Sequence, residues 1–354
     1  MLHYQFSFVN KQKHIFCVTK NLAKGANKYL SRRKWLYICL IAICTITLIF
    51  TVPQLVTQPP QRFVAVTFDD LPVITDRDDD GVKLNTTNKL LASITKNKIP
   101  TIGFVNENQL FNDVTGQLNA SELHLLRAWL KNGLELGNHT YSHINLNELG
   151  LAAYEADVVR GEIITKRLLK NYGKKMRYFR HPYLHTGRDQ KTKQGLEKIL
   201  EAHGYIVAPV TIFLEDWKFN PAYDQAFLHG NKAMMSKIGQ AYLSYVEQGL
   251  DYWERQSVKL FKREIKQVIL FHSTTINADY FGAIAERLKK RGYKFITIDE
   301  ALRDEAYKSK DNYVGDGVSW LHRWALTQGK NFVLDSRPQV PYFVSAYNLD
   351  TSGQ

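Results

Sequence analysis

The stretch Phe63–Pro72, FVAVTFDDLP, decides the fold. Residues 63–68 are apolar or small at almost every position, so both alternating faces predict burial, as in a central strand of a parallel sheet. Two adjacent aspartates, Asp69 and Asp70, end this apolar run. In α/β folds the carboxyl ends of strands carry ligands and chemistry. An aspartate pair after a strand can also simply cap a turn, so the rest of the chain has to decide.

The same rhythm of short apolar strand, loop and helical stretch repeats along the chain. The expected strands are Phe63–Phe68, Thr101–Val105, Gly133–Gly137, Arg177–Arg180, Tyr205–Ile212, Gln267–Phe271 and Lys294–Ile298. The expected helices are Thr87–Lys96, Ser121–Lys131, Leu149–Lys170, Gln190–Ala202 and Ala278–Arg291, with a mostly helical stretch at Tyr223–Lys266. Strands that alternate with helices predict a parallel sheet, and both a closed barrel and an open sheet fit this pattern.

The formal charge of +13 over 354 residues is concentrated at the N-terminus. Residues 1–61 carry eight Lys or Arg and no acid, which leaves 13 − 8 = +5 for the remainder. The excess is therefore a feature of the tail and not a basic binding face, and we expect no nucleic-acid partner.

Residues Trp35–Val52 form an uncharged apolar run of 18 residues directly after Arg32-Arg33-Lys34. As a helix this run spans roughly 27 Å, enough for a bilayer core. The basic residues before it predict a cytoplasmic N-terminus. We expect a basic cytoplasmic tail at 1–34, a transmembrane anchor at 35–52 and a linker at 53–61, with the catalytic domain periplasmic or extracellular. A cleaved secretory signal is the alternative.

The cysteines are Cys17, Cys39 and Cys44, all within the tail and the apolar run. The exported part therefore cannot form an internal disulfide. Any metal ion there must be held by histidine or carboxylate side chains.

The motif His139-Thr-Tyr-Ser-His143 follows an expected strand. On a helix, residues i and i+4 project from one face and can share a metal ion. The zinc-protease pattern with this spacing has Glu after the first His, but here that position is Thr140, so a base must come from elsewhere. A bare H-x-x-x-H is more often structural.

The aspartate pair supplies what the two histidines lack. One carboxylate would complete a His-His-Asp ligand set, and the other would stay free to deprotonate water, because a carboxylate bound to a metal is a poor proton acceptor. An arginine of the segment Arg177–Tyr183, RYFRHPY, could hold the free aspartate ionised.

A further histidine, His272, ends the apolar run VILFH. Asp216, at a neighbouring strand end, would favour the imidazolium form of His272 and make it a candidate general acid. Trp217 follows directly and suits the face of a sugar ring, although Glu215-Asp216-Trp217 alone reads equally well as a turn.

In this order, TFDD, HTYSH, RHPY, EDW and LFH resemble the five motifs of the NodB-homology polysaccharide deacetylases, carbohydrate esterase family 4. The resemblance covers about Phe63–Ala301. It implies a distorted (β/α) barrel of about seven parallel strands. The chain departs from many members of the family at His181, where they have proline.

The resemblance implies roles for the polar residues at the strand ends. Asp69 would be the catalytic base, oriented by Arg180. The metal ligands would be Asp70, His139 and His143. The metal would be divalent, with Zn²⁺ as first choice and Co²⁺, Ni²⁺ or Fe²⁺ as alternatives.

It implies further roles on the opposite side of the site. His272 would be the catalytic acid, tuned by Asp216. The backbone amide of Tyr183 would help to hold the oxyanion. Trp217 and Leu270 would line the substrate groove and the acetyl pocket.

The predicted function is metal-dependent hydrolysis of N-acetyl groups from amino sugars of an extracytoplasmic glycan. An O-deacetylase or deformylase of a cell-envelope or lipid-linked sugar would use the same site, and an inactive membrane-tethered glycan-binding module is an alternative of another class. The deacetylase domain is expected at 62–303. We expect the extension 304–354 to pack on the barrel through Trp320 and Trp324, although these could form a sugar-stacking platform. No specific protein partner is expected.

Overall fold

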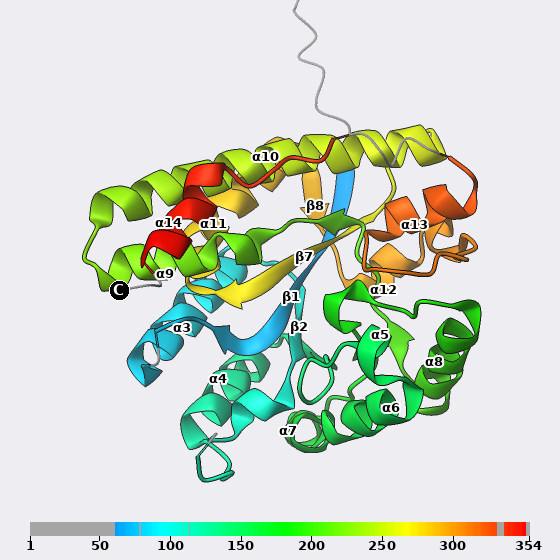
Figure 1. Cartoon of the computed structure of the whole chain (residues 1–354), viewed down its shortest axis with the longest axis horizontal. Helices are drawn as coiled ribbons and strands as arrows, with labels where there is room; N and C mark the ends of the chain where they lie inside the picture. Colours follow the sequence, from blue (N-terminus) through cyan, green and yellow to red (C-terminus); the bar gives the residue numbers. More distant parts are fainter. Residues whose placement is uncertain (1–60, 78, 113, 331–335, 352–354) are drawn as a thin grey trace, which may run out of the picture. The chain divides into compact units, whose positions relative to one another are not determined.

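The computed structural model describes residues 61–77, 79–112, 114–330 and 336–351 (Figure 1). The predicted tail, the predicted anchor and all of the predicted linker except Gln61 lie outside the described residues. Among the residues that are described, no helix is long and apolar enough to cross a membrane.

A parallel sheet forms the centre of the described chain. Its strands are β1 (Arg62–Ile74), β2 (Thr101–Val105), β3 (Glu135–Asn138), β4 (Tyr178–Phe179), β5 (Ile206–Val207), β6 (Ile212–Phe213), β7 (Gln267–Thr274) and β8 (Tyr293–Phe295). The order is β5-β4-β3-β2-β1-β7-β6, with β8 paired to the start of β1. Every pairing is parallel, which confirms the predicted α/β class.

The predicted strand Tyr205–Ile212 is wrong as one element, because it contains both β5 and β6. These lie at opposite ends of the sheet order and do not pair with each other, so the eight-stranded sheet is curled and open rather than closed. The backbone N–H of Ala208 bonds to the strand on one side and that of Thr211 to the strand on the other. Pro209 lies between them and has no N–H to continue either ladder.

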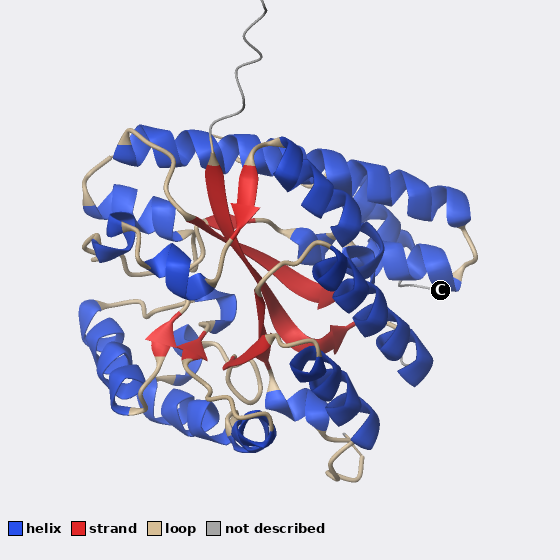
Figure 2. Cartoon of the chain, turned by 180° about the vertical axis from the view of Figure 1, so that it is seen from behind, coloured by secondary structure: helices blue, strands red, loops and turns tan. Residues whose placement is uncertain are grey.

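Helices surround the fan of strands (Figures 1 and 2). The α-helices are α3 (Asp80–Lys96), α4 (Ala120–Lys131), α5 (Leu146–Leu149), α6 (Leu151–Arg160), α7 (Ile163–Asn171), α8 (Gln190–Ala202), α9 (Asn220–Leu228), α10 (Lys232–Phe261), α11 (Thr275–Lys290), α12 (Ile298–Leu302), α13 (Trp320–Thr327) and α14 (Tyr342–Thr351). Short 3-10 turns are η1 (Glu107–Leu110), η2 (Pro182–Leu184), η3 (Asp216–Lys218) and η4 (Glu305–Lys308). The single predicted helix Leu149–Lys170 is interrupted at Gly150 and Gly161.

The core explains why β1 is apolar on both faces. Val64, Val66 and Phe68 are all at most 1% exposed. The ring of Phe68 packs against Trp129 and Phe271, with centroid distances of 5.9 and 5.7 Å. Burial of one such side chain contributes about 1.5–3 kcal/mol. Both faces of β1 are therefore core, as its continuous apolar run predicts.

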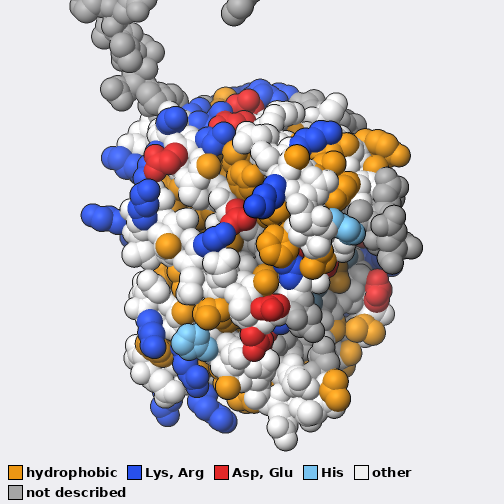
Figure 3. All heavy atoms as spheres, turned by 90° about the vertical axis from the view of Figure 1, so that its left-hand side faces the viewer, with side chains coloured by type: hydrophobic (Ala, Val, Ile, Leu, Met, Phe, Trp, Pro, Cys, Tyr) orange, Lys and Arg blue, Asp and Glu red, His pale blue; other side chains and the backbone are white. Residues whose placement is uncertain are grey.

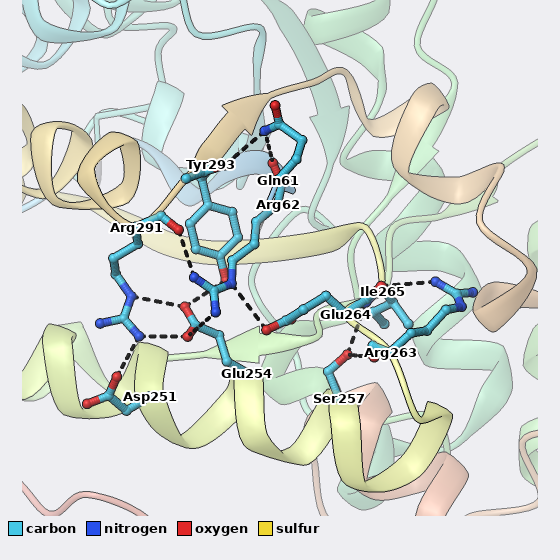
Figure 4. Close-up of polar contacts among 11 residues, drawn as sticks. Gln61, Arg62, Asp251, Glu254, Ser257, Arg263, Glu264, Ile265, Arg291 and Tyr293 are labelled. Atoms are coloured by element: carbon cyan, nitrogen blue, oxygen red, sulfur yellow. Dashed lines mark hydrogen bonds and ion pairs between the residues drawn. The ribbon is translucent and has the colours of Figure 1, made fainter. Parts of the chain in front are cut away.

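A charged network ties the amino end of β1 to α10 (Figure 4). Glu254 accepts hydrogen bonds from Arg291 at 2.6 and 3.0 Å and from the hydroxyl of Tyr293 at 3.1 Å. Arg62 lies 3.4 Å from the same carboxylate and also bonds to Glu264 at 3.1 Å. The network fixes the point where the chain enters the sheet.

The surface carries charges of both signs. On the face that Figure 3 shows, lysine and arginine side chains are interspersed with acidic and apolar ones. This agrees with the small net charge left once the tail is set aside.

The regular ladder of β1 breaks at its carboxyl end. Its register with β2 shifts between Phe68 and Leu71, and Asp70 has a φ of +61°. The two aspartates thus lie inside β1, at an irregularity, and do not follow the strand as the sequence predicted. Such irregularities re-aim side chains near active sites.

Candidate active site

A cleft of about 530 Å³ opens at the carboxyl ends of the strands. Its lining contains every site residue predicted from the sequence except Arg180 and Asp216, which are fully buried. The lining residues are Asp69, Asp70, Ile74, His139, His143, His181, Tyr183, Leu184, His185, Phe213, Trp217, Pro221, Leu270, His272, Asp316 and Gly317.

Asp70, His139 and His143 bring three ligand atoms together within 4.8 Å of one another. Oδ1 of Asp70 lies 3.5 Å from Nε2 of His139 and 3.6 Å from Nε2 of His143. That oxygen is buried without a hydrogen-bond partner. A donor set of two imidazoles and one carboxylate, with an unsatisfied oxygen at its centre, fits a divalent cation.

The two histidines lie on a bend and not on a helix, so the predicted helical i, i+4 geometry is wrong. Thr140 and His143 have φ values of +66° and +53°, which a right-handed helix does not allow. The backbone N–H of Thr140 donates to Asn138 Oδ1 at 2.7 Å, and this bond replaces a helical one. The rings of His139 and His143 nevertheless converge, with centroids 4.9 Å apart.

A hydrogen bond to the backbone fixes the orientation of the His139 ring. Its Nδ1 lies 2.8 Å from the backbone carbonyl of Arg180, so Nδ1 donates and the lone pair of Nε2 faces the donor set, 3.5 Å from Oδ1 of Asp70. Burial lowers the pKa of His139 well below its ordinary value, and the nearby His143 lowers it further. The neutral form is the one that binds metal ions.

Asp69 is the second carboxylate of the pair and is only 2% exposed. Its Oδ2 lies 3.6 Å from Nη1 of Arg180, whose Nη2 donates to Thr67 Oγ1 at 2.9 Å. Burial raises the pKa of Asp69 to about 7, although Arg180 and His272 lower it. A carboxylate with such a pKa can accept a proton near neutral pH.

The arginine beside Asp69 is thus Arg180, one of the two that the sequence offered. Arg177 lies elsewhere and pairs with Glu135 at 3.2 Å and with Asp299 at 2.8 Å.

His272 faces the aspartates from β7. Its Nδ1 lies 2.7 Å from Oδ1 of Asp216, and its backbone N–H donates to Oδ2 of the same carboxylate at 2.8 Å. Burial alone would lower the pKa of His272, but the Asp216 carboxylate raises it to about 9. The Nε2 atom lies 4.0 Å from Asp70, which directs the charged end of the ring toward the cleft.

The rim and the floor of the cleft carry the remaining predicted residues. Trp217 and Tyr183 are about half exposed, at 47% and 53%, and both line the opening. Leu270 is buried at the floor. Exposed aromatic faces at the rim of a cleft suit a sugar ring.

Several supporting residues escaped the sequence reasoning. Asn138 holds the bend through Thr140 and also donates to the carbonyl of Val158 at 2.9 Å. Asn277 donates to Asp216 at 2.6 Å. Buried polar residues at the ends of apolar strands were the available signal for Thr67 and Asn138, whereas Asn277 lies on α11 and has no local signature.

Residues 57–205 match the family model described as polysaccharide deacetylase. These residues form a polysaccharide deacetylase domain. The match includes the aspartate pair, the two histidines of the bend, Arg180 and Tyr183, and it ends before Asp216 and His272. The resemblance expected from the five motifs is therefore confirmed.

Two known proteins similar to this chain are a chitin deacetylase and a carbohydrate esterase. The chitin deacetylase of Colletotrichum lindemuthianum is 26% identical over 251 residues, which cover 70% of this chain and 82% of that protein. Its solved structure has a TM-score of 0.45 and 21% identity over 70% of this chain and 90% of that one. The family 4 carbohydrate esterase from Streptomyces lividans has a TM-score of 0.42 and 20% identity, covering 68% of this chain and 95% of its own.

Proposed function

We propose that this polysaccharide deacetylase hydrolyses N-acetyl groups on amino sugars of a glycan outside the cytoplasm, with the help of a divalent metal ion. The observation that carries this proposal is the placement of Asp69 and His272 in one cleft with the Asp70, His139 and His143 donor set. A buried base, an opposing acid and a metal site are the groups that amide hydrolysis needs.

The metal would be held by Asp70, His139 and His143, and Zn²⁺ suits two imidazoles and one carboxylate. When bound there, a divalent cation supplies Lewis acidity toward the amide carbonyl and toward water. The remaining chemistry belongs to the protein's own side chains.

Asp69 would take a proton from the attacking water. Arg180 keeps this carboxylate oriented, and burial places its pKa near neutrality. The new C–O bond forms at the acetyl carbon, and the backbone N–H of Tyr183 would donate to the oxyanion.

His272 would then protonate the nitrogen as the C–N bond breaks, which releases acetate and a free amine. Its charged form is maintained by the Asp216 carboxylate. Proton transfers of this kind contribute roughly 10²–10⁴-fold to the rate.

The proposed location rests on the sequence of residues 35–52 and on the basic residues before them. An apolar run of this length with positive charge on its N-terminal side would hold the catalytic domain at the outer face of a membrane. Tethering of this kind would suit a cell-envelope glycan as substrate.

The test is acetate release by the full-length chain in detergent, with Zn²⁺ and after chelation, from chitooligosaccharides, peptidoglycan and acetylated xylan. We expect acetate from at least one of the first two substrates, lost on chelation and restored by Zn²⁺. Release from xylan alone would favour an O-deacetylase. Metal binding without turnover on any of the three would favour a glycan-binding module.

A further inference from the structure

The loop of residues 181–186 carries Tyr183 and is strained. Tyr183 and Leu184 are consecutive non-glycine residues with φ values of +55° and +56°. Each such residue costs on the order of 1–3 kcal/mol unless its surroundings hold it. The loop supplies part of this restraint itself, because the backbone N–H of Leu184 donates to the carbonyl of His181 at 3.0 Å. The Tyr183 ring, although 53% exposed, also packs on His143, with centroids 4.5 Å apart. The C-terminal extension adds a restraint from outside the loop.

Gly317 of the C-terminal extension lies directly against this loop. A Cβ atom added at Gly317 would lie 1.7 Å from the backbone oxygen of Tyr183 and 2.8 Å from its carbonyl carbon. Both neighbours are main-chain atoms, which cannot rotate away as a side chain would. Only glycine allows the two segments to approach this closely.

Arg323, on α13, forms hydrogen bonds with the other end of the loop. Its side chain is buried, and its Nη2 donates to the hydroxyl of Thr186 while Nη1 lies 3.4 Å from the carbonyl oxygen of Leu184. Nε donates to Asp311 at 2.9 Å, which balances the buried charge. The guanidinium also lies 4.6 Å from the ring centroid of Trp320.

The same part of the extension is anchored to the sheet. The backbone N–H of Trp320 donates to Val210 at 2.8 Å, and Ser319 Oγ donates to the carbonyl of Thr211 at 2.7 Å. Both acceptors lie in the crossing between β5 and β6. The Trp320 ring stacks on His181, with centroids 6.4 Å apart and ring planes at 21°. The loop is thus held by an element that is itself fixed to the sheet.

The family match ends at residue 205, so the whole of this support lies outside it. Gly317 also lines the catalytic cleft, together with its neighbour Asp316. We propose that Gly317 and Arg323 are positioning residues for deacetylation, which act through the 181–186 loop to place the Tyr183 amide at the oxyanion. This inference rests on the proposed function of the cleft.

The first experiment measures kcat, KM, bound Zn²⁺ and melting temperature for Gly317→Ala and Arg323→Lys of the full-length chain. Because a shift of about 1 Å in a donor can cost as much as 10²-fold, we expect kcat of each folded variant to fall about 10- to 100-fold while KM and metal content stay near wild type. The melting temperature shows at which temperatures each variant is folded. Gly282→Ala on α11 and Arg263→Lys, which loses a pair with Asp304, are the matched controls with no loss of kcat.

The second experiment separates positioning from general damage. A chitooligosaccharide bearing a methylphosphonamidate in place of one acetamide is tetrahedral at phosphorus, like the transition state. Its affinity should fall in each variant by the same factor as kcat/KM. The affinity of the ordinary acetylated oligosaccharide, measured in an Asp69→Asn background, should not change.

The outcomes are distinct. Folded variants with wild-type kcat would overturn the inference, as would a kcat loss matched by loss of Zn²⁺ or by equal losses in the controls. Should Gly317→Ala fail to fold, Arg323→Lys decides alone. A wild-type chain that releases no acetate from any substrate overturns the proposed function, and this inference with it.

Discussion

Asp69 and His272 are register partners across the parallel strands β1 and β7. The proposed base and the proposed acid therefore stand side by side on one ladder, and the backbone pairing of Val64–Phe68 with Gln267–Phe271 fixes their separation. Their surroundings push their pKa values in ways that suit opposite tasks, since Asp69 reaches about 7 and His272 about 9.

The pH dependence of Asp216→Asn tests the assignment of the acid. The base must be deprotonated and the acid protonated, so wild-type kcat/KM should rise as Asp69 loses its proton and fall as pH passes about 9. Without the carboxylate, burial again lowers the pKa of His272, so the falling limb should move to lower pH. A falling limb that does not move would contradict the role of His272, and Glu215→Gln is the control.

The order within the aspartate pair gives a second prediction. Asp69→Asn should lower kcat roughly 10²–10⁴-fold and keep bound Zn²⁺, because it removes only the proton acceptor. Asp70→Asn should instead lose Zn²⁺, because it removes one of three ligands. Metal content and acetate release on the same samples check both. The reverse pattern would exchange the two roles.

The proposed catalytic side chains could be predicted from the sequence because each lies at the end of an expected strand or directly after it. Parallel strands bring their carboxyl ends to one edge, so Asp69, His139, Arg180 and His272 meet wherever the sheet forms. The sheet's parallel class was predictable for the same reason. The gap in the sheet between β5 and β6 was not predictable. One apolar run supplies both strands, and the change of pairing partner occurs within four residues around Pro209.

The geometry of the bend that carries His139 and His143 could not be predicted from the sequence either. The sequence separation of His139 and His143 suits a helix as well as this bend, and hydrogen bonds to the side chains of Asn138 and Asp157 hold the bend. Ser142, for example, is held by Asp157, fifteen residues away. The contact between Gly317 and Tyr183 spans a still longer stretch of chain, and no local pattern marks it.

Gly161→Ala should weaken metal binding, because Gly161 lies against the backbone of the bend that carries His139 and His143. Gly161 has an ordinary φ of −76°, so alanine is allowed by its own backbone. The added Cβ would, however, lie 2.3 Å from the carbonyl carbon of Thr140 and 2.4 Å from the backbone nitrogen of Tyr141. The displaced bend should lower Zn²⁺ affinity about 10- to 100-fold, measured by competition with a chelator. Gly282→Ala is the control, and an unchanged affinity would show that the bend tolerates the shift.

Glu254→Gln should destabilise the fold without affecting catalysis. The carboxylate joins Arg62, Arg291 and Tyr293 at the amino end of β1, and it is 6% exposed. Loss of its charge removes one carboxylate partner from each of two guanidinium groups, which should cost about 1–3 kcal/mol.

The melting temperature should therefore fall by about 2–4 °C for each kcal/mol. At temperatures where the variant is folded, kcat should equal that of wild type, because Arg62 and Asp69 stand about 23 Å apart along β1. Asp251→Asn is the matched control, since it bonds to the same Arg291 from a 53% exposed position and should change stability by less than about 1 kcal/mol. An equal loss of stability in both variants would show that the stabilisation comes from the pairing of Arg291 and not from Glu254 in particular. A loss of kcat in Glu254→Gln would show that the amino end of β1 affects the cleft.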